Sequence, residues 1–430
     1  MSLPKYRDYK DSGTDWLREI PSDWELRPLG YFFRERKTTV SDMDYQALSV
    51  TKAGIVPQLE TAAKTDNGDN RKLVKSGDFV INSRSDRKGA AGLSTLDGSV
   101  SLISTVLEPR GIHGRYVHYL LRSEAFQEEY YRFGTGIVAD LWSTRYSAMK
   151  LITLPAPSAT EQATIVDFLD RETAKIDALL AKQEQLIATL REDRTATITH
   201  AVTKGLDPSA EMKDSGVEWV GPVPANWDVA RITRMFTVTL GKMLQPSPTS
   251  PADRLQPYIR AAHIPPTGFT TEGATEMWFS PREVRDLTLR RGDIAVVEGG
   301  MGGYGRCDLI PHDLEGWGFQ NSINRLRTRG GNDSAYAKYA LQIAREQGFM
   351  EALCSVSTMP HLTAEKLGAM RIPNPPLAEQ REIVAFLDER CRINDDLIAK
   401  ADEVIATLRE YRSALITDAV TGKIDVRGAA

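Results

Sequence analysis

The chain has 430 residues, beyond the roughly 250–300 at which a single hydrophobic core stops growing, so at least two domains are expected. Hydrophobic residues make up 41% and charged residues 26%, and no apolar run approaches the roughly 20 residues that cross a bilayer, which excludes an ordinary membrane-spanning protein. The formal net charge of −4 excludes nucleic-acid binding by bulk positive charge, so such binding would need local basic surfaces.

Cysteine and histidine usage argues against a metal site. The three cysteines, Cys307, Cys354 and Cys391, form no CxxC motif, and the six histidines have no metal-ligand spacing. The N-terminus lacks the apolar core of a signal peptide. We therefore expect a cytoplasmic protein without disulfides, bound metal or cofactor.

The first notable feature along the chain is a short sequence block that is repeated in its second half. KDSGTDWLREIPSDWEL begins at Lys10, and KDSGVEWVGPVPANWDV begins at Lys213. Four tryptophans stay in register at an offset of 203 positions (214 − 11), and we expect them to fill the core where each domain meets a helix: Trp16, Trp24, Trp219 and Trp227. Because repeats decide architecture, the block predicts a protein with two equivalent halves.

A region that diverges in sequence but keeps its outline follows each block. GDFVINS from Gly77 and GDIAVVEGG from Gly292 each predict a β-strand after a Gly-Asp turn. The first region ends in a longer connection, from Asp140 to Pro155, than the second, from His361 to Pro373. Because of this difference, the sequence does not show which residues of the two halves are equivalent near the end of the first variable region.

A long helix is predicted after each variable region. From about Thr160 to Thr203 apolar residues recur at steps of three and four, with Ser158 or Thr160 as the cap and Gly205 at the end. The same pattern returns at an offset of 218 positions (379 − 161). About 40 helical residues extend roughly 60 Å. Neither apolar stripe can bury itself alone, so we expect an antiparallel pair.

One position breaks the match between the two helices. Asn394 stands where the first helix has Ile176. A polar residue in the seam of a helix pair can specify its register at a cost in stability. A solvated irregularity is the alternative.

The order of these elements resembles a known family. IPxxW, a variable β-rich region, LPxP or IPxP, EQxxIVxFLD and a long helix occur twice, as in the specificity subunits of type I restriction-modification systems. The resemblance covers essentially the whole chain. It implies an α+β fold in which two target-recognition domains with twisted, mainly antiparallel sheets are joined by an antiparallel coiled coil of two long helices. The implied bounds are residues 1–157 and 207–375 for the recognition domains and 158–206 and 376–425 for the helical regions.

The resemblance also implies partners and a division of labour. Each recognition domain would read one half of a split target in double-stranded DNA. Two methyltransferase subunits and a restriction and translocase subunit would bind the chain, and these partners would use S-adenosylmethionine, ATP and Mg. The chain itself would catalyse nothing.

Arginine reads guanine and amides read adenine, so the polar loops after strands supply the DNA-contact candidates. Solvated turns are the alternative for every one of them. The candidates are Thr51, Lys52, Arg84, Arg87 and Lys88 in the first domain and Arg260, His263, Tyr304, Arg306, Gln320 and Asn321 in the second. On the helices, the predicted partner-binding residues are Glu161, Gln162, Phe168, Glu379, Gln380 and Phe386.

Two other functions compete with this interpretation. NPPL at Asn374–Leu377 is close to the NPPY-type motif of adenine methyltransferases, but it lacks the stacking aromatic residue, and no glycine-rich cofactor loop follows an early strand. A coiled-coil scaffold whose variable domains bind protein or carbohydrate is also compatible with the periodicity. Salt-sensitive binding to duplex DNA would separate the scaffold from the DNA reader.

Overall fold

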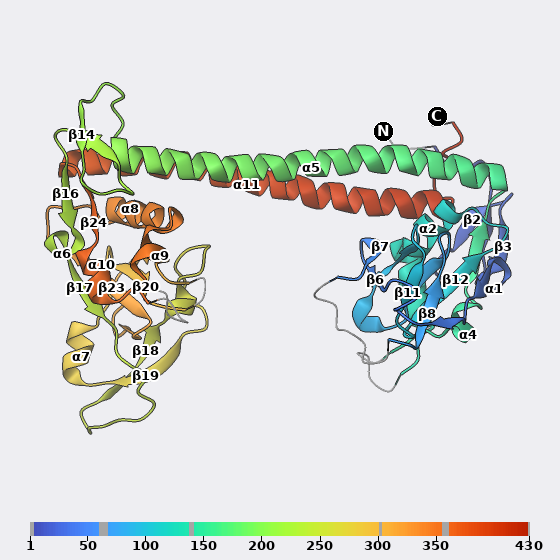
Figure 1. Cartoon of the computed structure of the whole chain (residues 1–430), viewed down its shortest axis with the longest axis horizontal. Coiled ribbons are helices and arrows are strands. Elements are labelled where there is room, and N and C mark those ends of the chain that lie inside the picture. The colour runs from blue at the N-terminus through green and yellow to red at the C-terminus, as the bar shows by residue number, and fades with distance from the viewer. Residues whose placement is uncertain (1–3, 60–67, 137–141, 301–302, 355–360, 429–430) are drawn as a thin grey trace. The chain divides into compact units, whose positions relative to one another are not determined.

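The chain folds into two compact units, Met1–Glu184 with Ala401–Ala430 and Gln185–Lys400 (Figure 1). The computed structural model describes residues 4–59, 68–136, 142–300, 303–354 and 361–428. Each unit contains one variable region and parts of both long helices, α5 (Ala159–Lys204) and α11 (Leu377–Val420).

The remaining elements of the first unit are short. Its strands are β1 (Tyr9–Asp11), β2 (Glu19–Pro21), β3 (Glu25–Pro28), β4 (Phe33–Glu35), β5 (Thr39–Val40), β6 (Leu48–Thr51), β7 (Gly54–Pro57), β8 (Arg71–Val74), β9 (Phe79–Asn82), β10 (Ala91–Leu93), β11 (Gly98–Val100), β12 (Ser104–Pro109) and β13 (Thr153–Ala156). Its helices are α1 (Leu29–Phe32), η1 (Ser85–Arg87), α2 (Gly114–Arg122), α3 (Glu124–Arg132) and α4 (Tyr146–Met149).

The second unit repeats this plan. Its strands are β14 (Met212–Asp214), β15 (Pro222–Pro224), β16 (Asp228–Arg231), β17 (Phe236–Leu240), β18 (Arg254–Ile259), β19 (Thr275–Phe279), β20 (Ile294–Val297), β21 (Cys307–Leu309), β22 (Gly318–Phe319), β23 (Ile323–Thr328) and β24 (Arg371–Asn374). Its helices are α6 (Ile232–Met235), η3 (Ala261–His263), α7 (Pro281–Asp286), α8 (Ser334–Glu346), α9 (Phe349–Leu353) and α10 (Ala364–Ala369).

The central sheets of the two units share one topology. The strand order is β4-β12-β9-β10 in the first unit and β17-β23-β20-β21 in the second, all antiparallel. The predicted strands after the Gly-Asp turns are β9 and β20, and they occupy the same place in both sheets. The three-stranded sheets differ, β11-β8-β5 against β19-β18-β22, which includes a parallel pair. The expected α+β fold with two equivalent halves is confirmed.

The Gly-Asp turns are built around a buried carboxylate. Asp78 accepts a hydrogen bond from Arg36 Nε at 2.7 Å and another from the Lys75 N–H. In the second unit Asp293 accepts from Arg327 Nε at 2.8 Å. Both aspartates are 2% exposed. The motif is therefore structural, because the arginine pair satisfies a charge that would otherwise be buried without a partner.

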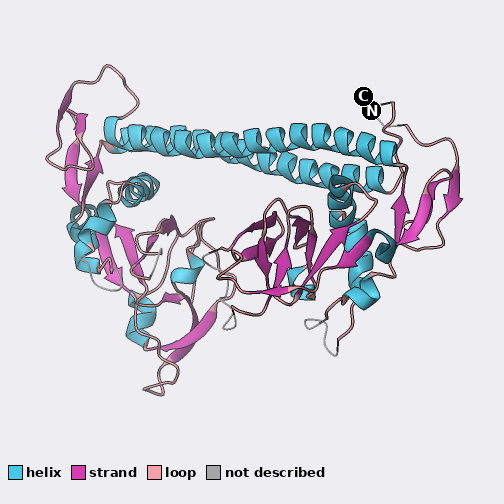
Figure 2. Ribbon diagram, turned by 45° about the vertical axis from the view of Figure 1, so that its right-hand side comes forward, coloured by secondary structure: helices cyan, strands magenta, loops and turns pink. Residues whose placement is uncertain are grey.

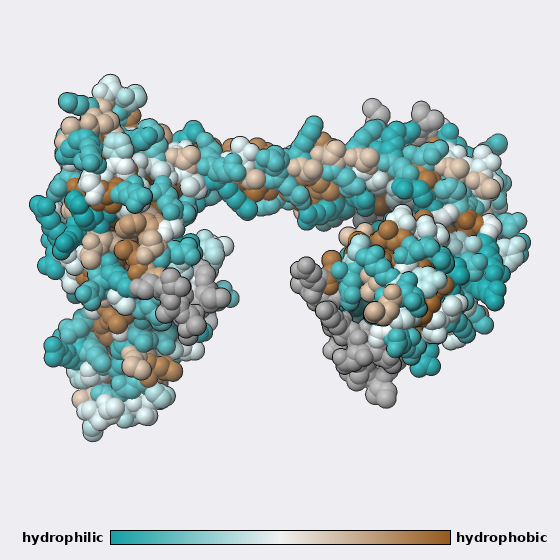
Figure 3. Space-filling view, viewed as in Figure 1, coloured by the Kyte–Doolittle hydropathy of each residue, from teal (hydrophilic) through white to brown (hydrophobic). Residues whose placement is uncertain are grey.

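The long helices begin and end close to the predicted positions. Ser158 Oγ accepts from the Glu161 N–H, which makes it the cap, and Gly205 takes a φ of +75° after the last turn of α5. Within each unit the helices lie alongside one another and run antiparallel (Figure 2). Asp177 pairs with Arg412 in the first unit, and Arg194 pairs with Asp395 in the second. Apolar patches interrupt the hydrophilic surface of the helices (Figure 3).

Two tyrosines in each unit join the recognition domain to the helices. From α2, Tyr119 donates to Asp170 at 2.6 Å and Tyr116 donates to the Val420 carbonyl at 3.2 Å. From α8, Tyr339 donates to Asp388 at 2.7 Å and Tyr336 donates to the Val202 carbonyl at 3.0 Å. Each domain therefore contacts the start of one long helix and the end of the other, and the FLD motif supplies the aspartate.

The tryptophans pack where domain meets helix, as expected. Trp24 is fully buried in the core shared by the first recognition domain, the start of α5 and the end of α11. Trp227 packs among residues of both long helices, and its indole N–H donates to Glu379 at 2.9 Å. Trp16 and Trp219 are partly buried against the same cores.

The structure also resolves the equivalence that the sequence left open. Isolated β-bridges pair Arg84 with Ser143 and Gly299 with His361. The equivalent residues are therefore Ser143 and His361, and both lie 12 positions before the proline that precedes the helix. The prediction that the first connection is longer than the second was wrong. Its length was counted from Asp140, three residues before the bridge at Ser143, whereas the second was counted from the bridge at His361.

The described residues contain no helix with the length and apolar character that crossing a membrane requires. Within the same part of the chain, no three metal-ligating side chains come together.

Arg18 occupies a backbone conformation that costs free energy. Its φ is +58°, and the equivalent residue of the second half is Gly221, with a φ of +65°. A non-glycine residue in this region costs about 1 kcal/mol. We expect Arg18→Gly to raise the free energy of unfolding by about that amount, measured by urea titration. Arg18→Ala keeps the Cβ and should give no such gain, so an equal gain from alanine would contradict this explanation.

Asn394 lies in the helix pair and is not a solvated irregularity. It is 6% exposed, and its amide donates to the Leu190 carbonyl and to Asp193, both at 3.3 Å. Asn394→Ile should raise the free energy of unfolding by roughly 1–2 kcal/mol, since apolar burial replaces two long hydrogen bonds. Asn394→Asp should lower it by placing a carboxylate beside Asp193. A loss of stability with isoleucine would show that the amide contacts dominate.

Candidate nucleic-acid interface

In the first unit, three chain segments meet at one end of the central sheet. Ser83, directly after β9, donates its N–H to the Ile103 carbonyl before β12 at 3.3 Å. Its own carbonyl accepts from the Thr144 N–H at 3.0 Å, and its hydroxyl lies 3.0 Å from that of Ser143. We call this meeting point the first junction.

The second unit builds the same junction from different side chains. Glu298, directly after β20, donates its N–H to the Ser322 carbonyl at 2.9 Å, and its own backbone carbonyl accepts from the Leu362 N–H at 2.7 Å. Its carboxylate lies 2.9 Å from His361 Nδ1. The hydroxyl pair of the first junction is therefore replaced by a carboxylate and an imidazole on an equivalent backbone.

The structure brings some of the first-domain candidates together. Arg84 lies in the first junction and is exposed, and no described acidic side chain pairs with it. Arg87 and Lys88 follow in the same loop, where Arg87 pairs with Asp86 and Lys88 pairs with Glu128.

Thr51 and Lys52 lie apart from the first junction, in the β6–β7 hairpin. The Thr51 hydroxyl donates to the Gly54 carbonyl, and the Lys52 carbonyl accepts from Arg122. The Thr51 hydroxyl is thus engaged inside its own turn. Lys52 is exposed at the tip of this hairpin.

Four of the second-domain candidates lie around the second junction. Gln320 and Asn321 are in the turn before β23, and Asn321 is exposed. Arg260 is exposed and precedes Ala261, whose N–H donates to Ser322 Oγ at 3.1 Å. Arg306 lies at the end of the loop after β20, and its carbonyl accepts from the Val297 N–H, one residue before Glu298.

Three candidates are less accessible than the sequence suggested. His263 is 1% exposed, its Nδ1 accepts from the Arg260 N–H, and burial lowers the pKa of its imidazole. Burial and then Arg345 lower the pKa of Arg306. Tyr304 is partly buried, and its carbonyl accepts from Arg345. A DNA contact from His263 would require this turn to open.

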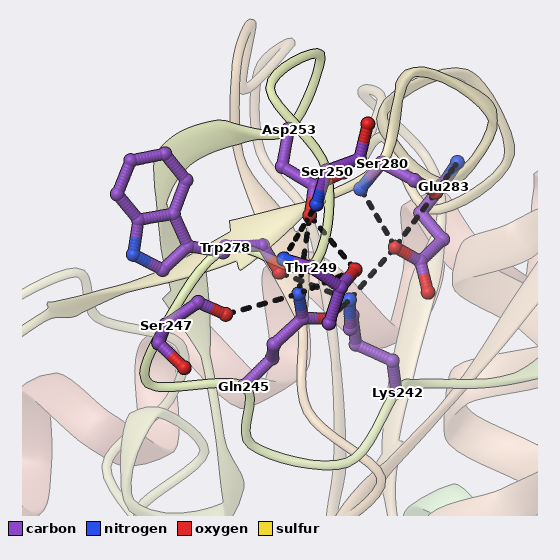
Figure 4. Close-up of polar contacts among 9 residues, drawn as sticks. All are labelled: Lys242, Gln245, Ser247, Thr249, Ser250, Asp253, Trp278, Ser280 and Glu283. Atoms are coloured by element: carbon purple, nitrogen blue, oxygen red, sulfur yellow. Dashed lines mark hydrogen bonds and ion pairs between the residues drawn. The ribbon is translucent and has the colours of Figure 1, made fainter.

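A polar network fixes the loop beside the second junction (Figure 4). The Lys242 N–H donates to the Phe319 carbonyl, while its ammonium donates to Gln245 at 2.7 Å and to Glu283 at 2.7 Å. Burial opposes ionisation of Glu283, but the hydrogen bonds from Lys242 and Ser280 hold its pKa below the ordinary value. The backbone beside Gln320 and Asn321 is therefore well supported.

The residues predicted to bind partner subunits lie at the starts of the long helices. Gln162 and Gln380 are buried, and each accepts a backbone N–H, from His113 and from Asp333. Glu161 accepts from the Tyr6 hydroxyl at 2.8 Å.

The two phenylalanines of this motif differ in exposure. Phe168 is 5% exposed and belongs to the core of the first unit. Phe386 is 40% exposed. With the Trp227 contact of Glu379, the other five members of the predicted set contact their own recognition domains. Partner binding by the set stays a prediction.

Sequence reasoning missed Lys242, the Glu298–His361 contact and the apolar turn at Leu102 and Ile103. The only local signal was position, directly after or before a strand of the central sheet. Their convergence depends on strand pairing between distant segments.

The chain is similar to specificity subunits in sequence. A family model described as the type I restriction modification DNA specificity domain matches residues 291–406. The putative type I restriction enzyme MjaX specificity subunit of Methanocaldococcus jannaschii is 21% identical over 99% of both chains. The StySPI specificity subunit of Salmonella potsdam is 21% identical over 94% of this chain and 90% of its own.

Solved structures share the fold. A chain from the type I R-M system, solved to describe complex assembly and conformational transition, is 16% identical with a TM-score of 0.70 and covers 96% of this chain and 99% of its own. The HsdS subunit from Thermoanaerobacter tengcongensis is 17% identical with a TM-score of 0.53 and covers 94% and 98%. With the duplicated motifs and the equivalent junctions, the chain is similar in sequence and in fold to the specificity subunits of type I restriction-modification systems.

Proposed function

We propose that this chain recognises a bipartite DNA target for a type I restriction-modification enzyme, with one half-site read by each variable domain. The observation that carries the proposal is the pair of junctions. Their sheets and backbone hydrogen bonds are equivalent, whereas their side chains differ. Two junctions with the same backbone framework but different polar side chains are expected to bind two different half-site sequences.

The long helices are the proposed docking surface for two methyltransferase subunits. Leu179 and Leu397 are equivalent in the repeat and are 46% and 43% exposed. Leu186 and Val404 are also equivalent and are 44% and 42% exposed. Apolar side chains exposed to the same degree at repeat-related positions favour a partner that binds twice. We place the restriction subunit in the same assembly.

We further propose that the chain has no catalytic activity. Asn374 of the NPPL segment lies in β24, and its side chain accepts from Gln380 at 3.0 Å, so it has a structural partner at the start of α11. S-adenosylmethionine, ATP and Mg would then bind to the partner subunits. The working compartment of this complex would be the cytoplasm.

The test is purification of the chain with the methyltransferase encoded beside it, followed by sequencing-based mapping of methylated adenines. A single split motif with a constant gap is expected, and one half of the motif should be lost when either variable domain is deleted. DNA binding should weaken steeply with salt, because phosphate contacts release counterions. Methylation by the chain alone would favour an enzyme, and a complex without DNA binding would favour a scaffold.

A further inference from the structure

The turn before the central strand of each junction has the same geometry but opposite chemistry. In the first unit the Ser104 N–H donates to the Ser101 carbonyl at 2.9 Å, which places Leu102 and Ile103 at the centre of the turn. In the second unit the Ile323 N–H donates to the Gln320 carbonyl at 2.9 Å, around Asn321 and Ser322.

Large apolar residues at the centre of a tight turn are unusual, because such positions favour glycine, proline, asparagine, aspartate and serine. Leu102 is 45% exposed and Ile103 is 38% exposed, and neither belongs to a described core cluster. The exposed apolar surface therefore contributes little to folding. A ligand that covers it would recover the free energy of apolar burial.

The surroundings of this turn identify the ligand. The Ile103 carbonyl accepts from both the N–H and the hydroxyl of Ser83, and the next residue is the exposed Arg84. An exposed arginine next in sequence to the residue that binds this apolar turn is complementary to the major groove, where phosphates flank thymine methyl groups. A protein partner would account for the apolar pair alone.

We propose that Leu102 and Ile103 read the C5-methyl groups of thymines in the half-site bound by the first variable domain. This inference rests on the proposed function. The second domain, with Asn321 and Ser322 at the equivalent positions, reads hydrogen-bonding groups instead. The chemical difference between the two turns thereby gives the two half-sites different sequences.

The experiment replaces thymine with deoxyuridine, which removes only the methyl group. The complex of this chain with its methyltransferase is titrated against duplexes carrying thymine or deoxyuridine in the first half-site, as defined by methylation mapping. Each contacted methyl should contribute about fourfold to affinity, the value of one buried carbon. The same replacement in the second half-site should leave affinity unchanged.

A double variant supplies the control for this turn. Leu102→Asn with Ile103→Ser copies the turn of the second unit and should bind thymine and deoxyuridine duplexes equally. Leu151→Asn, at a residue 61% exposed outside the junction, should keep the preference for thymine. Normal DNA binding without a thymine preference, or a first half-site without thymine, would overturn the inference alone. Absence of DNA binding would overturn the proposed function as well.

Discussion

Replacing Gln320 and Asn321 together with alanine is expected to abolish recognition in the second half-site while leaving the first half-site readable. Both residues lie in the turn before β23, and no described protein group accepts from their amide N–H₂ groups. An amide that bonds adenine through two hydrogen bonds contributes about 1–3 kcal/mol of discrimination. The variant should therefore bind its target roughly 10–100-fold more weakly, measured by titration of the complex with labelled duplex.

The pattern of the loss distinguishes base reading from phosphate contact. If the amides read bases, the variant should lose affinity for the target but not for a duplex with a scrambled second half-site. A uniform loss on both duplexes, with a smaller salt dependence, would instead assign the amides to the backbone. Gln347→Ala, an exposed amide after α8, is the matched control and should change neither affinity.

The long helices were predictable because their information is local. The three-to-four spacing of apolar residues, the Ser158 cap and Gly205 are all readable within one segment, and the bounds of α5 differ from the prediction by one residue at each end. The second predicted helical region, 376–425, extends five residues past the end of α11 at Val420. The strands after the Gly-Asp turns were predictable for the same reason.

The junctions were not predictable, because they depend on pairing between distant segments. Ser83, Ile103 and Ser143 meet through hydrogen bonds that span 20 to 60 residues. No local pattern marks Ile103 as the neighbour of Arg84. The DNA-contact candidates predicted in the loop after β9 were therefore its charged residues, Arg84, Arg87 and Lys88, and Leu102 and Ile103 were not among them.

The EQ motif illustrates a different limit. The sequence identified Gln162 and Gln380 as repeated and therefore important, and a role in partner binding was the natural expectation. In the structure each amide accepts the N–H of the residue before α2 or α8 and donates to a carbonyl of the proline-rich segment before its own helix. Repetition alone cannot distinguish a contact inside the chain from a contact with another chain.

Because the EQ motif is engaged inside the chain, the exposed apolar residues on the outer faces of the helices are the residues to test for binding of the methyltransferase. Leu179→Glu should remove one methyltransferase subunit from the complex, and Leu397→Glu should remove the other. A carboxylate at the centre of an apolar interface is costly to desolvate, and a few central residues carry most of the binding free energy. Native mass spectrometry should therefore find two methyltransferase copies per chain in the wild type, one in each single variant and none in the double variant.

The control uses the same repeat on the opposite side of the helices. Ala181 and Ala399 are exposed and related by the offset of 218 positions, and they lie about 160–200° around the helix from the leucines. Ala181→Glu with Ala399→Glu should leave two methyltransferase copies bound. Thermal unfolding should stay unchanged in all variants, because the replaced leucines are nearly half exposed. Two bound copies in the double leucine variant would show that the methyltransferase docks on another surface. Phe386, at the start of α11, would then be the next residue to replace, because it is the most exposed member of the predicted set.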